Sequence, residues 1–325
     1  MLASLLGSMA GFLGQGGGFW LPEAASKTAE PVDALFNFVL WICIFFFVLI
    51  CVLMILFVMR FRRQRPDEEA LSQVEHNSAL EITWTVIPLA LAIAIFWMGF
   101  KGYMDLATPP ANSMGVQVQA QKWSWLFSYP NGVSAAELHV PEDTPVKLTM
   151  SSSDVLHSFF VPAFRIKQDV VPGRYTTVWF HPTRTGEFQV YCTEYCGKGH
   201  SDMLSKVIVH SRTDYDKWMD EEGNFIDKMP APEAGAKVFQ KYGCKQCHSV
   251  DGAGGTGPTF KGLWGIDQPL TTGAKVKVDE NYVRESILQP QAKIAAGYEP
   301  VMPTFQGRMN DKEIGVLIEY LKTLK

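Results

Sequence analysis

Five consecutive residues carry the clearest chemistry in this sequence. They read Cys244-Lys245-Gln246-Cys247-His248. The Cys-x-x-Cys-His spacing is the attachment motif of a c-type haem. The two thiols add to the vinyl groups of the porphyrin, and the histidine that follows is held next to the iron. The motif therefore predicts a covalent haem bound by Cys244, Cys247 and His248.

A second group of soft ligands lies upstream. It reads Cys192-Thr-Glu194-Tyr-Cys196-Gly-Lys-Gly-His200-Ser-Asp-Met203, and His157 adds an imidazole from an earlier loop. Thiolates, imidazoles and a thioether together favour copper over hard cations. Two bridging thiolates can hold a pair of coppers that share one electron. The chain thus contains two sets of redox-suited ligands, and electron transfer is the first hypothesis.

Two other interpretations of this second group stay open. One is a disulfide between Cys192 and Cys196, and the other is a structural zinc site made of two cysteines and two histidines. Neither interpretation needs Met203, and neither accounts for Glu194 between the thiols.

Length and composition limit the classes of protein that fit. A chain of 325 residues is long enough for two or three domains. The net charge of −4 argues against nucleic acid as a partner. Of the six cysteines, four belong to the two ligand groups, while Cys43 and Cys51 lie in an apolar run. Free cysteines there behave as small buried hydrophobic residues, so no cysteines remain for a disulfide framework.

Two apolar segments predict a membrane anchor. Residues 34–59 contain no charged residue. At ~1.5 Å per residue this run reaches roughly 39 Å, enough to cross a ~30 Å hydrocarbon core with some tilt. A second run lies within residues 81–100, and Pro88 should kink it.

The basic residues between the two runs set the orientation of the hairpin. They favour the cytoplasmic side and are Arg60, Arg62, Arg63 and Arg65. We therefore expect the chain after about residue 101 to lie outside the cytoplasm, in the compartment where haem c is attached.

The remaining chain divides into segments with different patterns. Residues 1–30 form an N-terminal segment and a candidate signal sequence, in which Ala24-Ala25-Ser26 could be cut. No basic residue precedes Lys27, so cleavage is left open. The hairpin occupies 31–107. Residues 108–220 contain short alternating strands separated by turn signals and predict an antiparallel β-sandwich, with the Cys192–Met203 group between two strands.

The C-terminal residues predict a small helical domain. We expect a linker at 221–231, marked by Pro230-Ala-Pro232, and an all-α domain at 232–325 that begins with a helix at 233–242. Asn310 and Glu313 form a predicted capping box at the start of the last helix. No histidine follows His248, so the second axial ligand is Met302 or Met309.

Met302 is the preferred of these two methionines. It precedes Pro303 and follows Pro300 closely, and prolines restrict the backbone of a ligand loop. Met309 lies next to the start of the last helix, where packing is the simpler role.

The upstream motifs resemble subunit II of the haem–copper cytochrome c oxidases, and the likeness covers residues 31–220. The C-terminal part resembles a class I cytochrome c, as in the caa-type oxidases. The implied fold is a multidomain membrane protein with a two-helix transmembrane hairpin, a cupredoxin-like antiparallel β-sandwich and an all-α class I cytochrome c domain.

The resemblance also implies roles for individual residues. Cys192 and Cys196 would bridge a dinuclear copper A centre, His157 and His200 would each cap one copper, and Met203 would be a weak ligand. Glu194 would contribute its backbone carbonyl, and its carboxylate would face a magnesium site shared with subunit I.

Other implied roles lie outside the copper loop. Trp123 would be the residue at which electrons enter over the copper centre, and its alternative is a packed core aromatic. Glu81 would lie near the entrance of a proton pathway, and its alternative is an ordinary interfacial carboxylate. The Pro258 carbonyl would lie near His248, and Met302 would be the axial methionine.

The function implied by the resemblance is electron input to an oxidase. Electrons would pass from an external donor (cytochrome c, another small redox protein or a bc-type complex) to haem c, then to copper A and to subunit I. Subunit I would reduce oxygen to water and pump protons, and this chain contains no oxygen-reducing site. Expected partners are subunit I, subunit III and membrane lipid, at the bacterial inner membrane with the copper and haem domains on the periplasmic side.

Two other functions remain open. Nitrous oxide reductase and certain nitric oxide reductases use a similar copper loop, although the former normally lacks such a membrane hairpin. A free-standing, membrane-anchored electron carrier is the second.

The two redox domains are expected to contact each other through charged side chains. We expect lysines of the cytochrome domain to face Asp154, Asp169 and Asp202; the alternative is that these lysines form an ordinary solvated surface. These lysines are Lys237, Lys241, Lys245, Lys275, Lys277 and Lys293.

Overall fold

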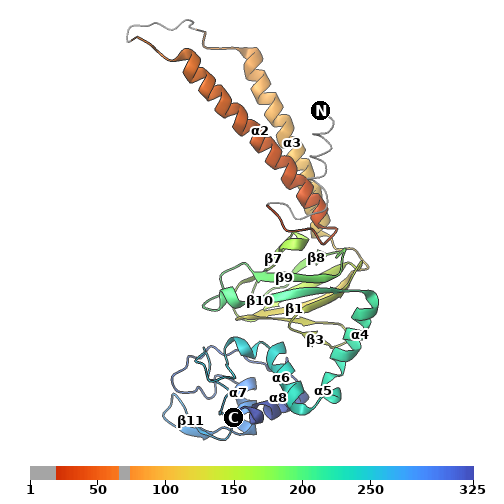
Figure 1. The fold of residues 1–325 in the computed structure, drawn as a ribbon, viewed down its shortest axis with the longest axis vertical. Helices are drawn as coiled ribbons and strands as arrows, with labels where there is room; N and C mark the ends of the chain where they lie inside the picture. Colours follow the sequence, from red (N-terminus) through yellow and green to blue (C-terminus); the bar gives the residue numbers. More distant parts are fainter. Residues whose placement is uncertain (1–19, 66–73) are drawn as a thin grey trace. The chain divides into compact units, whose positions relative to one another are not determined.

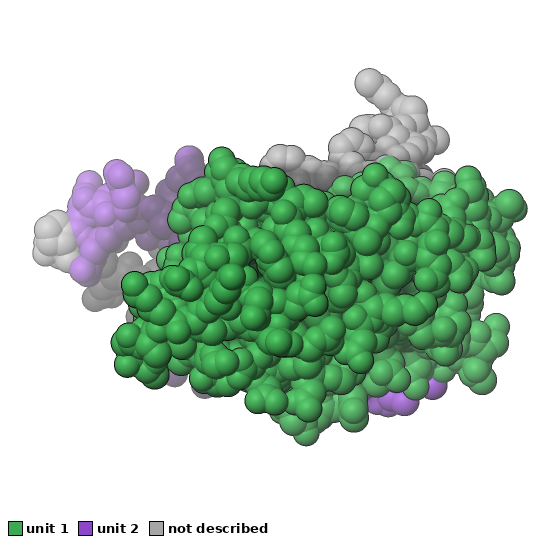
Figure 2. Space-filling view, turned by 90° about the horizontal axis from the view of Figure 1, so that it is seen from below, with its two compact units in different colours: residues 1–27, 109–325 green, residues 28–108 purple. Residues whose placement is uncertain are grey.

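The computed structural model describes residues 20–65 and 74–325. It divides into two compact units, one of residues 28–108 and the other formed by residues up to Lys27 together with 109–325 (Figures 1 and 2). The N-terminal segment predicted as a candidate signal sequence lies mostly outside the described residues. At its described end Ala25 is fully buried, and its backbone N–H donates to the Ala163 carbonyl over 2.9 Å.

The first of these units consists of two long helices. They are α2 (Ala29–Phe61) and α3 (Ser78–Ala107). Both are apolar all round, and no residue of their most apolar stretches is buried within the protein. Helix α3 continues through Pro88, and the Asn77 side chain caps its start by accepting from the Leu80 N–H. A helix with an apolar surface on every side is suited to lipid, which agrees with the predicted hairpin.

The sandwich consists of two five-stranded sheets. The first has the order β3-β2-β1-β5-β8, with β1 (Met114–Gln121), β2 (Ser124–Ser128), β3 (Ser134–Ala135), β5 (Val146–Ser152) and β8 (Thr176–Phe180). The second has the order β4-β10-β9-β6-β7, with β4 (Leu138–Pro141), β6 (His157–Val161), β7 (Ile166–Val170), β9 (Gly186–Cys192) and β10 (Leu204–His210). Most neighbours are antiparallel, as predicted, but β1 with β5 and β10 with β4 are parallel.

Alternating side chains form the core of the sandwich. In β5, Val146, Leu148 and Met150 are buried while the residues between them are partly exposed. The short helices η1 (Pro162–Phe164) and η2 (His200–Asp202) follow β6 and precede β10. Strands β6 and β9 pair with Phe159 opposite Cys192, so the start of β6 lies beside the end of β9. This register brings His157 near the Cys192 loop.

The C-terminal domain contains helices α6 (Ala231–Lys241), α7 (Glu280–Leu288) and α8 (Asp311–Thr323). The turn η3 (Cys244–Gln246) and the hairpin β11 (Asp267–Pro269) and β12 (Lys275–Lys277) complete its elements. The capping box of Asn310 and Glu313 is present, as predicted. The Lys241 ammonium also contacts the Glu313 carboxylate at 2.8 Å, and the Tyr242 hydroxyl donates to it over 2.9 Å.

The segment at 221–231, expected as a linker, is largely helical. Helix α4 (Arg212–Gly223) extends into it, and α5 (Phe225–Lys228) follows. Trp218 of α4 packs against the core of the sandwich, whereas Phe225 is buried in the core of the C-terminal domain. Apolar residues of this connection therefore pack against both the sandwich and the C-terminal domain. The acidic composition of the segment does not indicate this packing.

Gly235 allows α6 and α8 to approach closely. An added Cβ there would lie 2.0 Å from the Val316 carbonyl oxygen and 2.6 Å from the Tyr320 Cβ. We therefore expect Gly235→Ala to destabilise this domain by about 2 kcal/mol through overpacking. Faster hydrogen–deuterium exchange in α6 and α8 would measure the loss. Gly315→Ala is the matched control, because nothing lies within 4 Å of its added Cβ. Equal exchange in the two variants would contradict this role of Gly235.

Candidate metal and haem centres

The upstream ligand group is gathered in one place, where β6 begins and β9 ends. Cys192 ends β9, and His157 begins β6. The two cysteine Sγ atoms lie 3.8 Å apart, and the Cys192 Sγ lies 3.9 Å from the His157 Nδ1. The Cys196 Sγ lies 3.4 Å from the His200 Nδ1. Each thiol therefore has its own imidazole nitrogen beside it.

Two further atoms complete the cluster. The Met203 Sδ lies 3.9 Å from the Cys196 Sγ, and the Glu194 backbone oxygen lies 3.4 Å from the Cys192 Sγ. Met203 and His157 are fully buried, and Cys196 is 3 % exposed. The donor set consists of two thiols, two imidazoles, a thioether and a carbonyl, which suits copper better than a four-coordinate structural zinc.

The disulfide interpretation does not fit this geometry. A disulfide has an S–S length of about 2.05 Å. The Cys192 and Cys196 sulfurs are 3.8 Å apart, and both cysteines are free.

Asp154 holds His157 in the orientation that points its Nδ1 at the cysteines. The Asp154 Oδ1 lies 2.9 Å from the His157 Nε2, and its Oδ2 accepts the Lys122 backbone N–H over 2.7 Å. Burial raises the pKa of Asp154, but the hydrogen bonds from His157 and Lys122 outweigh it and lower this pKa overall. Burial lowers the pKa of His157, and its hydrogen bond to Asp154 reverses the direction and raises it.

The two thiols differ in acidity. Burial raises the pKa of both. In Cys192 hydrogen bonds with His157 and with nearby backbone groups outweigh burial and lower the pKa to about 6. In Cys196 burial and the negative charge of Cys192 raise the pKa to about 12. Because thiolates bind metals and thiols do not, metal binding at this pair should release a proton at neutral pH.

Trp123 lies against the loop that carries the cysteines. Its Nε1 donates to the Cys196 backbone oxygen over 3.1 Å. An added Cβ at Gly199 would lie 2.6 Å from the indole ring, so this glycine gives the ring its space. Trp123 is 8 % exposed and belongs to the core of the sandwich. The contact fits both the packing interpretation and the electron-transfer interpretation of this residue.

The Cys-x-x-Cys-His turn faces a cavity of the C-terminal domain. This cavity holds about 1300 Å³ of empty space, counting its open mouth. The His248 Nδ1 lies 2.7 Å from the Pro258 carbonyl oxygen, the partner expected from the resemblance. Donation from Nδ1 to that oxygen leaves Nε2 free to bind iron. Phe260 stacks on the imidazole at 4.5 Å between ring centroids.

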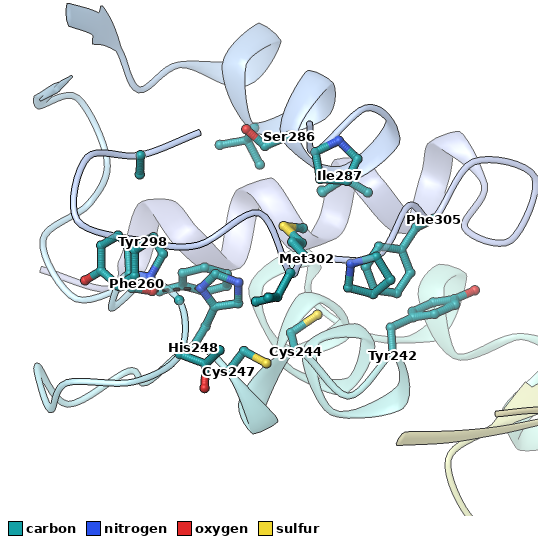
Figure 3. A pocket seen from close by; sticks show the side chains of 18 of the residues that line it. Tyr242, Cys244, Cys247, His248, Phe260, Ser286, Ile287, Tyr298, Met302 and Phe305 are labelled. Atoms are coloured by element: carbon teal, nitrogen blue, oxygen red, sulfur yellow. Dashed lines mark hydrogen bonds between the residues drawn. The ribbon is translucent and has the colours of Figure 1, made fainter. Parts of the chain in front are cut away.

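Both candidate axial methionines line the same cavity. Figure 3 shows Met302 on the segment across the cavity from Cys244 and Cys247. Met302 is partly exposed to the cavity, whereas Met309 is 5 % exposed and packed in the core of the domain. The contrast favours Met302 as the ligand.

Glu81 has a local role in helix α3. Its Oε1 accepts the Asn77 backbone N–H over 3.1 Å and lies 3.8 Å from the His76 Nδ1. The carboxylate therefore stabilises the start of α3, and these two local contacts account for its position.

Sequence reasoning missed two residues that support the copper cluster. Asp154 was considered only as a docking carboxylate, although an aspartate three residues before a ligand histidine is a signal for an orienting partner. Gly199 was treated as part of the motif, and its contact with a tryptophan far away in the sequence became visible only in the folded chain.

Three families match successive parts of this chain. "Cytochrome C oxidase subunit II, transmembrane domain" matches residues 14–101, and "Cytochrome C oxidase subunit II, periplasmic domain" matches residues 133–211. "Cytochrome c" matches residues 232–325.

Several cytochrome c oxidase subunit 2 proteins resemble most of the chain. The protein from Alkalihalophilus pseudofirmus is 32 % identical over 302 residues, which cover 89 % of this chain and 86 % of the relative. That from Bacillus subtilis is 31 % identical over 82 % of this chain and 81 % of its own length. The protein from a Synechocystis species is 31 % identical over 61 % and 74 %.

The apolar helical hairpin, the sandwich with its soft-ligand loop and the helical domain with its haem motif define a membrane-anchored redox protein. The chain belongs to the cytochrome c oxidase subunit 2 family and carries a C-terminal cytochrome c domain fused to the subunit. It is thus a subunit of an oxidase that works with other subunits, and its domains imply copper and haem as cofactors. The predicted family and fold class are confirmed.

Replacing Asp154 tests whether it orients a copper ligand. In Asp154→Asn the His157 ring loses its charged partner, and we expect copper affinity to fall by about ten- to hundredfold. Titration against a competing chelator measures the affinity. Asp169→Asn is the control, because Asp169 accepts the Ser158 hydroxyl and contacts Lys167 without touching the cluster. Unchanged affinity in Asp154→Asn would contradict the orienting role.

Proposed function

We propose that this chain is the electron-input subunit of a caa-type cytochrome c oxidase. Electrons from an external donor would reach a covalent haem c, pass to a dinuclear copper A centre and continue to subunit I, where oxygen is reduced to water and protons are pumped. The observation that carries the proposal is the pairing, in one chain of this family, of a buried dithiol–imidazole cluster with a Cys-x-x-Cys-His turn that faces a cavity.

The residues that would hold the two cofactors are those around these two sites. Haem c would be held by Cys244, Cys247, His248 and Met302. Copper A would be held by His157, Cys192, Glu194, Cys196, His200 and Met203. Bound there, the two groups would supply one-electron redox chemistry, which the side chains at these sites do not provide by themselves.

The protein's own part is orientation and exclusion of water. Asp154 fixes the His157 imidazole, and the Pro258 carbonyl fixes that of His248. Burial of His157 and Met203 keeps water from the copper cluster. Trp123 donates to the backbone of the cysteine loop, which supports its assignment as the residue where electrons enter. Ligands that the protein holds rigidly would change little in geometry when the metal centre is reduced, which favours fast electron transfer.

Further assignments complete the proposal. The domain limits proposed from the sequence are 1–30, 31–107, 108–220, 221–231 and 232–325. Magnesium would bind near the Glu194 carboxylate at the boundary with subunit I, and subunit III would be a further partner. Arg60 to Arg65 would lie on the cytoplasmic side of a bacterial inner membrane, with the two redox domains in the periplasm.

Metal analysis of the full chain in detergent tests the copper and haem assignments together. We expect two coppers per haem iron, and an EPR spectrum whose hyperfine splitting shows one electron shared by both coppers. A zinc content in place of copper, or a Cys192–Cys196 disulfide with no metal, would overturn the copper assignment.

Purification from the native membrane tests the partnership. We expect the chain to remain with a multi-span haem–copper subunit in mild detergent. Isolation as a lone chain with both cofactors would instead support a free-standing electron carrier.

Replacing the proposed axial methionine tests the haem assignment. Met302→Ala should abolish the weak absorption band of thioether-ligated ferric haem, because no other side chain on that segment offers a thioether. Met309→Leu keeps an apolar group in the core and should retain the band. Survival of the band in Met302→Ala would transfer the ligand role to Met309.

Glu81 remains proposed as the residue near the entrance of a proton pathway in subunit I. Glu81→Gln should slow proton-coupled turnover, and unchanged steady-state oxygen consumption would remove this role.

A further inference from the structure

The cytochrome domain contacts the sandwich at the turn between β1 and β2. Leu126 of β2 is buried in the apolar core of the cytochrome domain, and Cys247 packs against the core of the sandwich. An added Cβ at Gly243 would lie 2.5 Å from the Ser124 Cβ. The same turn carries Trp123, so the haem motif and the residue against the copper loop belong to two sides of one contact.

Arg308 makes the polar part of this contact. Its guanidinium donates to the Gln121 side-chain oxygen at the end of β1, and Gln121 is only 3 % exposed. Among the described residues no carboxylate forms an ion pair with Arg308, and its Nε–H has no acceptor. The guanidinium also lies over the Phe305 ring, 5.7 Å from its centroid. A partly buried cation without a carboxylate partner is costly for the fold of its own domain, which indicates a role at the contact.

The charge of Arg308 complements a carboxylate of the copper domain. Burial lowers the pKa of Arg308, while the negative charge of Asp154 opposes this change. Asp154 is the group that accepts from the Lys122 N–H and from His157. The cation of the cytochrome domain thus lies in the field of the carboxylate that orients a predicted copper ligand.

The lysines expected at this contact have other partners. Lys237 pairs with Glu222, Lys241 with Glu313, and Lys293 with Glu285. For these three lysines the docking expectation was wrong, because acidic groups nearer in the fold compensate their charges. Arg308 instead contacts the copper domain, through the Gln121 side-chain oxygen and not through a carboxylate.

We propose that Arg308 is a positioning residue, which holds the haem cavity of the cytochrome domain against the β1–β2 turn through Gln121. The inference rests on the proposed function. One electron would be transferred from ferrous iron to the oxidised copper centre, without a proton or any further reactant. The tether alone supplies an effective donor concentration on the order of millimolar. The Arg308–Gln121 contact adds a fixed orientation, which removes the search by the tethered domain.

A double-mutant cycle in the purified full-length complex tests this role. The variants are Arg308→Met, Gln121→Met and the combination of both, and each removes a polar group while keeping an apolar side chain of similar length. Arg284→Met is the matched control, because Arg284 lies in the same domain and pairs with the exposed Asp311. The haem absorption and copper EPR spectra are recorded first, so that loss of a cofactor site is recognised separately.

The main measurement is the rate of electron transfer from haem to copper after flash reduction of the haem. We expect each single variant to be about tenfold slower and the double variant to be no slower than the singles, because the two groups act as one pair. In these variants the rate should also decrease as solvent viscosity increases, because a cytochrome domain released from the contact must diffuse back to the copper domain. Arg284→Met should stay within about twofold of the unmodified rate.

A second measurement does not depend on the cofactors. Hydrogen–deuterium exchange of residues 117–128 should become about tenfold faster in Arg308→Met and Gln121→Met, and remain unchanged in Arg284→Met. Unmodified rates of transfer and exchange in both single variants, with intact spectra, would overturn the proposal. If Arg308→Met loses its haem band, Gln121→Met decides the result, because Gln121 belongs to β1 of the sandwich and its own haem spectrum, recorded first, shows whether the adjoining haem cavity is intact. Absence of copper or haem from the unmodified protein would refute the proposed function, and the exchange measurement would still test the contact.

Discussion

The Asp154 carboxylate is the interaction on which the arrangement of the redox sites depends. One of its oxygens accepts the Lys122 N–H in the turn between β1 and β2, and the other contacts the His157 Nε2. A single half-buried carboxylate therefore connects the turn that carries Trp123 with the strand that begins at His157. Hydrogen bonds to a charged acceptor are roughly twice as strong as neutral ones, so this connection resists displacement. This connection fixes the orientation of the His157 ring, whose Nδ1 then points at the Cys192 thiol.

The cytochrome domain is built around a comparable buried group. Glu313 accepts from the Lys241 ammonium and the Tyr242 hydroxyl, and its backbone N–H is capped by Asn310. The end of α6 is thus joined to the start of α8 immediately before the turn that carries Cys244. A buried ion pair of this kind contributes little net stability, but loss of one partner is costly, by about 3–5 kcal/mol. Its effect is to fix the crossing of the two helices and, with it, the position of the haem motif.

The two redox domains share one arrangement of parts: rigid secondary structure carries some of the proposed ligands, and a short loop carries the rest. In the sandwich, β6 and the end of β9 hold His157 and Cys192, while the following loop holds Cys196 and His200. In the cytochrome domain the turn after α6 holds Cys244 to His248, and a separate loop holds Met302. Ligands from distant segments converge because the strands and helices between them are packed in one register, which limits their movement when charge changes.

The sequence by itself determined the elements and the chemistry of the donors. The apolar runs of α2 and α3, the alternation in β5, the capping box at Asn310 and the spacing of both ligand motifs could all be recognised because these patterns are local. Only the tertiary structure decided how distant residues meet. Two parallel strand pairs, the packing of Gly199 on Trp123, the helical connection at α4 and α5, and the choice of Arg308 over the lysines depend on contacts between residues far apart in the chain. Such contacts depend on register and side-chain packing across elements, and a single sequence contains no local signal for either.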